Sequence, residues 1–281
     1  MLMRDDLDYI MIKVGFKDYQ IHVETYGKGQ PLIILNGIMM STKSWIPFIE
    51  DFSKNNQLIL VDFLDQGQSS KLVHLDYDQS IQVEALHHVI KHLKLEKINL
   101  LGISYCGEVA IQYALKHSEY VEKLLLFNTT AWTSPWLKEI GHAWKMASFS
   151  GESYYATTIP VIYSPSFYTS NIEWIENRKK TLIPIFSDKD FIDSMNRLTD
   201  SAEDYDKRKE LRRLKTKTLV VSSDTDFVTP VLEQKLIVDS LENVDHIIIP
   251  NCGHASMYEA PVLFKSLVLG FIKDQTEFKL Q

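Results

Sequence analysis

The stretch LLGISYCG, residues 100–107, decides how this sequence should fold. It joins a short apolar run, typical of a buried strand, to a segment with helical spacing of its apolar residues. A nucleophilic serine must stand on a tight, strained turn between strand and helix, so its near neighbours have to be small. Gly102 precedes Ser104 by two residues, and Cys106 follows it by two, where glycine is common. The stretch predicts a nucleophile elbow with Ser104 at its tip, although a tight turn capped by a serine would look similar.

Short apolar runs alternate with helical periodicity along most of the chain. We expect strands at residues 9–14, 20–25, 31–35, 58–62, 98–101, 124–127, 218–221 and 246–249, and helices at residues 80–93, 108–116 and 261–272. Runs that are apolar on both faces suit the central strands of a parallel sheet. The order predicts an α/β fold, with a mainly parallel sheet, helices on both of its faces and an antiparallel start.

The alternation stops between residues 131 and 210. This region has no convincing strand run, is punctuated by Pro160, Pro165 and Pro184, and is rich in aromatic side chains. We interpret it as a helical insertion above the carboxyl edge of the sheet, where open α/β folds bind their ligands. The chain is thereby divided into a core domain, residues 1–130 and 211–281, and a helical cap, residues 131–210.

Two later loops supply candidates for the partners of the serine. The first follows the apolar run 218–221 and holds Asp224 and Asp226, either of which is suited to accept the Nδ1–H of a histidine. The second follows the run 246–249 and carries His254 directly after a glycine. The order serine, aspartate, histidine is the one expected when the serine stands on an elbow of this kind. We therefore predict a catalytic triad of Ser104, Asp226 and His254, with Asp224 as the alternative acid.

These landmarks resemble those of the α/β-hydrolase superfamily, in particular its small esterases, C–C hydrolases and acyl hydrolases. Two upstream loops extend the resemblance: LNGI at residues 35–38 and DFLDQGQS at residues 62–69. The chain departs from the family pattern at Asn36, where histidine is usual, and at Asp65-Gln66, where Gly-His is usual. Asparagine and aspartate tolerate a left-handed backbone better than most residues, so the turns can persist.

The resemblance also implies roles for individual residues. Pro230 follows Asp226 at the family's usual offset, which favours Asp226 over Asp224 as the acid. The oxyanion hole would consist of the backbone N–H groups of Ile38 and Tyr105. The second of these also follows from chemistry, because a residue that opens a helix points a free N–H at incoming negative charge.

The resemblance predicts a serine hydrolase that cleaves a carboxylic ester or thioester with an apolar acyl group. We expect Asn36, Met39, Trp132 and Trp136 near the substrate, although bulky residues of the cap could equally form its own core. A C–C bond hydrolase of meta-cleavage type, acting on a dienoic diketo acid with the same triad, is the second hypothesis. A ligand-binding receptor with little turnover is a third, from a different class.

The composition of the chain limits which binding partners are expected. The formal net charge of −7 argues against a general nucleic-acid binder, and the cysteines Cys106 and Cys252 do not suggest a disulfide framework. Acidic Asp5 and Asp6 stand where a signal peptide would be basic, and no run approaches the roughly 20 apolar residues that span a bilayer. We expect a cytoplasmic protein with a small-molecule substrate and no cofactor. No metal is expected either, since His88 and His92 lack an evident third ligand. The oligomeric state stays open.

Overall fold

The computed structural model describes residues 8–273, so Asp5 and Asp6 lie outside the described part. Within it the chain forms one eight-stranded sheet with the order β1-β2-β4-β3-β5-β6-β7-β8. The strands are β1 (Tyr9–Phe16), β2 (Tyr19–Tyr26), β3 (Gln30–Leu35), β4 (Asn56–Asp62), β5 (Ile98–Ile103), β6 (Val121–Phe127), β7 (Lys217–Ser223) and β8 (Val244–Ile249). Strand β2 runs antiparallel to both β1 and β4, and all other neighbours are parallel. The predicted mainly parallel sheet with an antiparallel start is confirmed.

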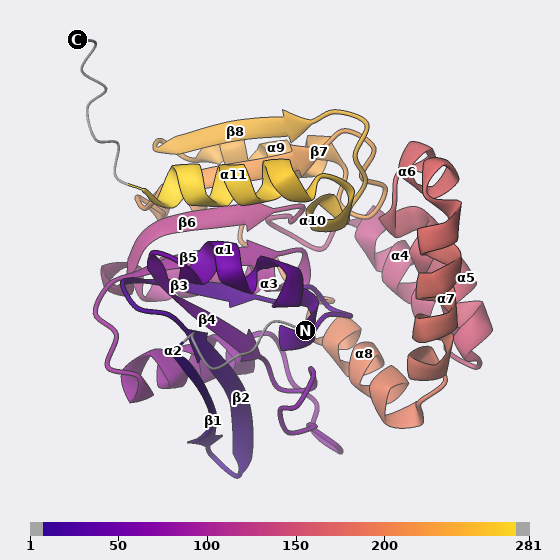
Figure 1. The fold of residues 1–281 in the computed structure, drawn as a ribbon, viewed down its shortest axis with the longest axis horizontal. Helices are drawn as coiled ribbons and strands as arrows, with labels where there is room; N and C mark the ends of the chain where they lie inside the picture. Colours follow the sequence, from indigo (N-terminus) through magenta and orange to yellow (C-terminus); the bar gives the residue numbers. More distant parts are fainter. Residues whose placement is uncertain (1–7, 274–281) are drawn as a thin grey trace.

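Helices cover both faces of the sheet (Figure 1). One face carries α2 (Ser80–His92), α3 (Tyr105–Lys116) and α9 (Val231–Ser240), and the other carries α1 (Ile49–Ser53) and α11 (Pro261–Ile272). The apolar stripe of each helix is buried against the sheet, and the central strand β5 is buried along its whole length. Two apolar layers, one on each side of the sheet, therefore fix its position and hold the loops at its carboxyl edge.

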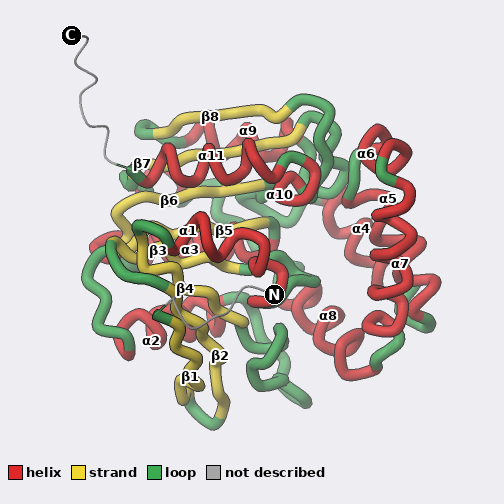
Figure 2. Tube along the Cα trace, viewed as in Figure 1, coloured by secondary structure: helices red, strands yellow, loops and turns green. Residues whose placement is uncertain are grey.

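Five helices between β6 and β7 lie together beside the sheet (Figures 1 and 2). They are α4 (Pro135–Met146), α5 (Gly151–Ile162), α6 (Pro165–Ser170), α7 (Ile172–Phe186) and α8 (Lys189–Ser201). Pro165 opens α6, but Pro160 and Pro184 lie inside α5 and α7 rather than between helices, each two residues before the last residue of its helix. Each proline still removes one i→i−4 hydrogen bond, but it does so in the last turn, so the helix formed before it is kept and ends two residues later.

Several polar contacts join these helices to the rest of the described chain, and three of them lie at separate places. Arg197 on α8 makes a two-pronged ion pair with Asp65, with Nε–Oδ2 3.0 Å and Nη2–Oδ1 2.5 Å. The hydroxyl of Tyr105 lies 2.8 Å from that of Ser201, and the hydroxyl of Ser164 donates to Glu259 over 2.6 Å. The α4–α8 segment is thus fastened at three separate places.

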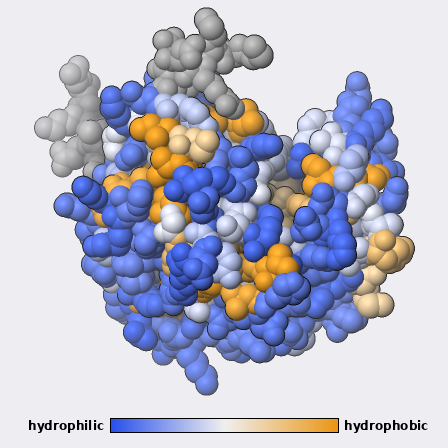
Figure 3. All heavy atoms as spheres, turned by 90° about the horizontal axis from the view of Figure 1, so that it is seen from below, coloured by the Kyte–Doolittle hydropathy of each residue, from blue (hydrophilic) through white to orange (hydrophobic). Residues whose placement is uncertain are grey.

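The face of the molecule seen in Figure 3 is largely hydrophilic, with apolar residues gathered in a few patches. Among residues 8–273 no helix has the length and apolar character needed to cross a bilayer. Within the same range no three His, Cys, Asp or Glu side chains are grouped closely enough to hold a metal ion. The ring of His88 instead lies 5.8 Å from that of Phe16, centre to centre.

Candidate active site

Ser104 occupies a strained turn between β5 and α3. Its backbone has φ 51° and ψ −126°, a conformation that costs energy for a residue with a side chain. A Cβ on Gly102 would lie 2.5 Å from the carbonyl oxygen of Cys106, and one on Gly107 would lie 2.5 Å from Thr129 Cβ. Both glycines are therefore required by close packing, whereas the position of Cys106 accommodates a buried side chain. The turn lifts the Ser104 side chain above the edge of the sheet.

The structure brings the three predicted triad residues together. His254 Nε2 lies 2.9 Å from Ser104 Oγ, and His254 Nδ1 lies 2.9 Å from Asp226 Oδ2. These residues come from the loops after β5, β7 and β8, and the parallel strands deliver all three loops to one edge of the sheet. Asp224 is exposed, and its Oδ1 accepts from the backbone N–H of Cys252 at 3.3 Å. The geometry therefore favours Asp226 over Asp224 as the partner of the histidine.

Asp226 is buried yet held in its charged form. Burial opposes ionisation, but the electrostatic interaction with the His254 ring and hydrogen bonds from His254, Thr229 and Asn128 outweigh it and keep the carboxyl pKa below its usual value. Oδ1 accepts the backbone N–H groups of Val228 and Thr229, both at 2.9 Å. A carboxylate fixed in this way can orient the imidazole and stabilise its protonated form.

Asn128 is a contributor that the sequence did not reveal. It has φ 47° and follows β6 directly, and its Nδ2 donates to Asp226 Oδ2 at 2.9 Å. Its Oδ1 accepts from Ser256 Oγ at 2.8 Å, close to the His254 loop. The available signal was a polar residue at the carboxyl end of the strand next to β7, which is too common a feature to single out one asparagine.

The loop after β3 is held by the residues that depart from the family pattern. Asn36 is buried: its Nδ2 donates to the carbonyl oxygen of Val61 at 2.9 Å, and its Oδ1 accepts from Trp45 Nε1 at 2.8 Å. Gln66 Nε2 donates to the carbonyl oxygen of Gly37 at 3.0 Å. Within residues 8–273 the backbone N–H groups of Ile38 and Tyr105 have no hydrogen-bond partner, so both are available to a ligand.

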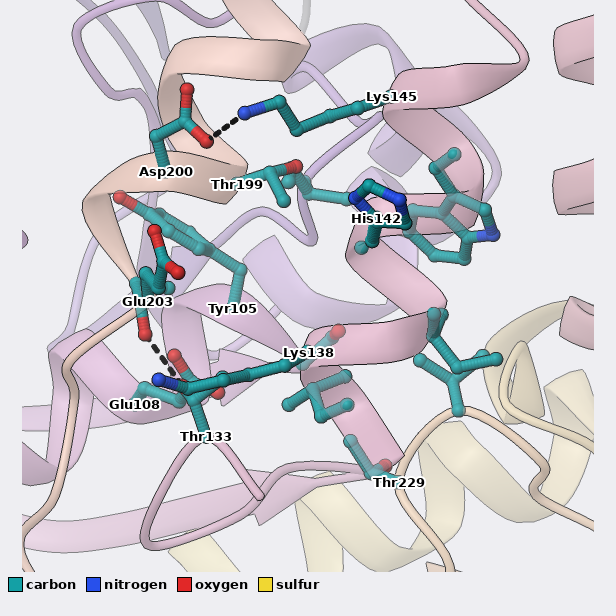
Figure 4. A pocket seen from close by; sticks show the side chains of 18 residues that line it. Tyr105, Glu108, Thr133, Lys138, His142, Lys145, Thr199, Asp200, Glu203 and Thr229 are labelled. Atoms are coloured by element: carbon teal, nitrogen blue, oxygen red, sulfur yellow. Dashed lines mark hydrogen bonds and ion pairs between the residues drawn. The ribbon is translucent and has the colours of Figure 1, made fainter. Parts of the chain in front are cut away.

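Ser104 lies where two cavities meet. Cavity A, of about 150 Å³, is lined mainly by α4 and α8 together with Tyr105 and Glu108 (Figure 4). Cavity B, of about 100 Å³, is lined by the loop 37–40, by α5 and α7, and by His254. Ile38, Ser104 and Trp144 line both. A substrate that spans the two cavities would place its central atoms at the serine.

Of the four residues predicted near the substrate, only Met39 lines one of these cavities. The side chain of Asn36 is buried and bonded to Val61 and Trp45, and Asn36 lines neither cavity. The Trp132 ring packs under the Arg208 guanidinium at 3.6 Å, and the half-exposed Trp136 donates from Nε1 to the carbonyl oxygen of Phe227 at 2.7 Å. The part of α4 that lines cavity A includes the apolar side chains of Leu137, Ile140 and Trp144, and Trp136 is not among the lining residues.

A serine on a strained elbow, bonded to a histidine that is in turn bonded to a buried carboxylate, is the arrangement of hydrolases that use a nucleophilic side chain. The comparison with protein families agrees with this class. The model of the α/β hydrolase fold matches residues 30–261, and the chain belongs to that family. The protein is thus a hydrolase of the α/β type.

Individual relatives span nearly the whole chain. The crystal structure of MGS-M2, an α/β hydrolase enzyme from a Medee basin deep-sea metagenome library, is 45% identical with a TM-score of 0.92 and covers 96% of this chain and 100% of its own. The putative carbamate hydrolase RutD of Pseudomonas syringae pv. syringae (strain B728a) is 21% identical, over 92% of this chain and 99% of its own length. The 2-hydroxy-6-oxo-6-(2'-aminophenyl)hexa-2,4-dienoic acid hydrolase of Metapseudomonas resinovorans is 24% identical, over 89% and 87%. The named activities of these relatives differ, so similarity to them does not determine the substrate of this protein.

Proposed function

We propose that this protein is a serine hydrolase that cleaves a carboxylic ester or thioester through an acyl-enzyme on Ser104. The observation that carries the proposal is the 2.9 Å contact between Ser104 Oγ and His254 Nε2 at the junction of two cavities. A serine hydroxyl is a weak nucleophile unless a base takes its proton. His254 is within reach to do so, and Asp226 holds the opposite ring nitrogen.

The reaction follows from these positions. Ser104 Oγ attacks the carbonyl carbon while its proton passes to His254 Nε2. The negative charge on the former carbonyl oxygen is stabilised by the N–H groups of Ile38 and Tyr105, the latter at the positive end of α3. His254 then protonates the leaving group, and water, activated by the same histidine, releases the acyl group from Ser104.

The two cavities suggest where each half of the substrate binds. The leaving group must take a proton from His254, which lines cavity B and not cavity A. We therefore place the leaving group in cavity B and the acyl group in cavity A. The side chains of Leu137, Ile140 and Trp144 give cavity A its apolar character, which supports an acyl group with an apolar stretch. In this proposal residues 131–210 act as the cap that shapes both cavities.

One observation favours a C–C bond hydrolase of the meta-cleavage type as the second candidate. Arg178 lines cavity B, and its Nε, although buried, has no hydrogen-bond partner among the described residues. A guanidinium beside the leaving group suits a dienoic acid, whose carboxylate would pair with it. The same triad would serve, because His254 would again deliver the proton to the departing fragment.

Hydrolysis of 4-nitrophenyl esters from acetate to decanoate tests the proposal. Wild type is expected to exceed Ser104→Ala by at least about 10³-fold on the best ester, because the variant lacks the nucleophile. Ser118→Ala, which changes an exposed serine beyond the end of α3, is expected to match wild type. A receptor without turnover would show no difference between wild type and Ser104→Ala on any ester. A dienoic diketo acid that is cleaved much faster than every ester would favour the second candidate.

A further inference from the structure

We propose that Glu108 binds a hydrogen-bond-accepting oxygen in the acyl chain, so that the preferred acyl group is an otherwise apolar chain interrupted by an ether, carbonyl or hydroxyl oxygen. The inference rests on the proposed function, because it assumes that the acyl group on Ser104 enters cavity A. It makes Glu108 a specificity-determining residue and gives it no part in bond cleavage.

Glu108 lies one helical turn beyond the nucleophile. Its backbone N–H donates to the carbonyl oxygen of Ser104 at 3.3 Å, and four residues of helix rise about 6 Å. Its side chain lines cavity A although the residue is only 3% exposed. Figure 4 shows it with Tyr105, Thr133 and Lys138 among the side chains around this cavity. An acyl chain of a few carbons would bring an oxygen within its reach.

Hydrogen bonds fix one oxygen of this carboxyl and leave the other one free. Gln79 Nε2 donates to Glu108 Oε2 at 2.6 Å, and Gln112 Nε2 donates to Gln79 Oε1 at 2.7 Å. Among residues 8–273, Glu108 Oε1 has no hydrogen-bond partner, and it is not sealed off from the cavity surface. The carboxyl is therefore held in one orientation with one oxygen still to be satisfied.

The surroundings keep this carboxyl neutral. Burial raises the pKa of Glu108 to about 8, against the hydrogen bond from Gln79 that lowers it. The ionisable groups next to it, Tyr105 and Cys106 on α3 and Tyr205 after α8, are themselves buried, and burial raises the pKa of each well above its usual value. They are therefore neutral near pH 7.

The other charged side chains around cavity A lie toward solvent. Each of them is either paired with an opposite charge or exposed. Lys138 pairs with Asp204 at 3.7 Å, Lys145 pairs with Asp200, and both Glu203 and His142 are exposed. Among residues 8–273 no cation thus lies within ion-pair distance of Glu108. Because Oε2 accepts from Gln79, the proton of the neutral acid belongs on Oε1, which becomes a donor aimed at the ligand.

This donor decides which acyl chains fit well. A buried O–H left without an acceptor carries a penalty, so a purely alkyl chain that fills cavity A would be disfavoured. Leu137, Ile140 and Trp144 offer apolar contacts to the rest of the chain. The preference therefore requires one oxygen at the right distance from the ester carbonyl rather than a polar chain throughout.

Matched esters test the inference. We would compare kcat/KM for 4-nitrophenyl 5-methoxypentanoate with that for the heptanoate, and for the 4-methoxybutanoate with that for the hexanoate, since each pair differs by one oxygen in place of a methylene. Wild type is expected to prefer one of the ether esters about 10-fold at pH 7. Glu108→Leu should remove that preference, whereas Glu108→Gln should keep it because the amide supplies an N–H donor. Glu203→Gln, a carboxylate on the same cavity, should keep the wild-type ratio.

The pH dependence separates recognition from a structural role. Between pH 7 and pH 9 the wild-type ratio should fall towards one as the carboxyl ionises and loses its proton, while the Glu108→Gln ratio stays constant. The inference is overturned if wild type and Glu108→Leu show the same ratio, or if wild type and Glu108→Gln share one pH profile. If Glu108→Leu does not fold, the comparison of wild type with Glu108→Gln decides the matter.

The failure of this inference can be told apart from the failure of the proposed function. If wild type hydrolyses the ether ester and the alkyl ester of each pair at equal rates, this inference alone is refuted. If wild type is no faster than Ser104→Ala, the proposed function is refuted and this inference with it.

Discussion

The sheet domain and the α4–α8 segment contribute to the site in different ways. Ser104, Asp226 and His254 all follow the carboxyl ends of parallel strands, β5, β7 and β8, and backbone and side-chain hydrogen bonds hold them. The α4–α8 segment supplies no triad residue, but it provides much of the lining of cavities A and B. The comparison teaches that the proposed chemistry and the choice of substrate are built by separate parts of the chain, which can be altered one at a time.

The largest effect should come from the acid of the sheet domain. Asp226→Asn is expected to lower kcat by about 10³- to 10⁴-fold, because the histidine loses the carboxylate that orients it and stabilises its charge. Asp224→Asn is the matched control, since Asp224 is exposed and does not touch the histidine. Steady-state kinetics on one good ester measure both. The reverse ranking would move the role of the acid to Asp224 and contradict the described geometry.

A smaller effect should come from the loop that carries Ile38. Gln66→Leu removes the 3.0 Å hydrogen bond to the carbonyl oxygen of Gly37. We expect kcat to fall roughly 10-fold with little change in KM, because contacts to the oxyanion strengthen in the transition state and loss of a whole donor costs about 10²–10³-fold. A rise in KM at unchanged kcat would instead assign Gln66 to substrate binding.

The smallest effect should come from the ion pair that joins α8 to the loop after β4. Arg197→Met leaves the buried Asp65 side chain with the Tyr77 hydroxyl and the Leu72 N–H as its hydrogen-bond partners among residues 8–273. We expect a loss of roughly 1–3 kcal/mol in the free energy of unfolding and a higher KM, with kcat nearly unchanged. Arg213→Met, whose side chain is 72% exposed, should change stability by less than about 0.5 kcal/mol. Denaturant unfolding measures both, and equal stabilities for the two variants would show that the ion pair does not fasten α8.

The same division explains what the sequence could predict. All eight expected strands occur, because runs such as 98–101 are apolar on both faces and have no other way to be buried. The elbow and the two later loops were recognisable because their demands are local: small neighbours for Ser104, and a carboxylate and a histidine after strands. Their convergence follows from the parallel order of β5, β6, β7 and β8.

The lining of the cavities could not be predicted in this way. The size of Trp132 and Trp136 suggests a place near the substrate, yet which side of α4 faces the serine depends on how α4 packs against α5 and α8. The sequence places Glu108 on a helix and no more, because its setting depends on Gln79, which precedes α2, and on a cavity lined by α4 and α8. The position of Asp65 likewise depends on Arg197, which lies 132 positions later in the sequence.

The central claim is that Ser104 is an activated nucleophile, and covalent labelling tests it most directly. Incubation with a fluorophosphonate followed by intact-mass and peptide analysis should show one adduct per chain on the peptide that contains Ser104. The adduct should be absent from Ser104→Ala and form far more slowly in Asp226→Asn. Absence of labelling in wild type, or equal labelling of Ser104→Ala, would contradict the account.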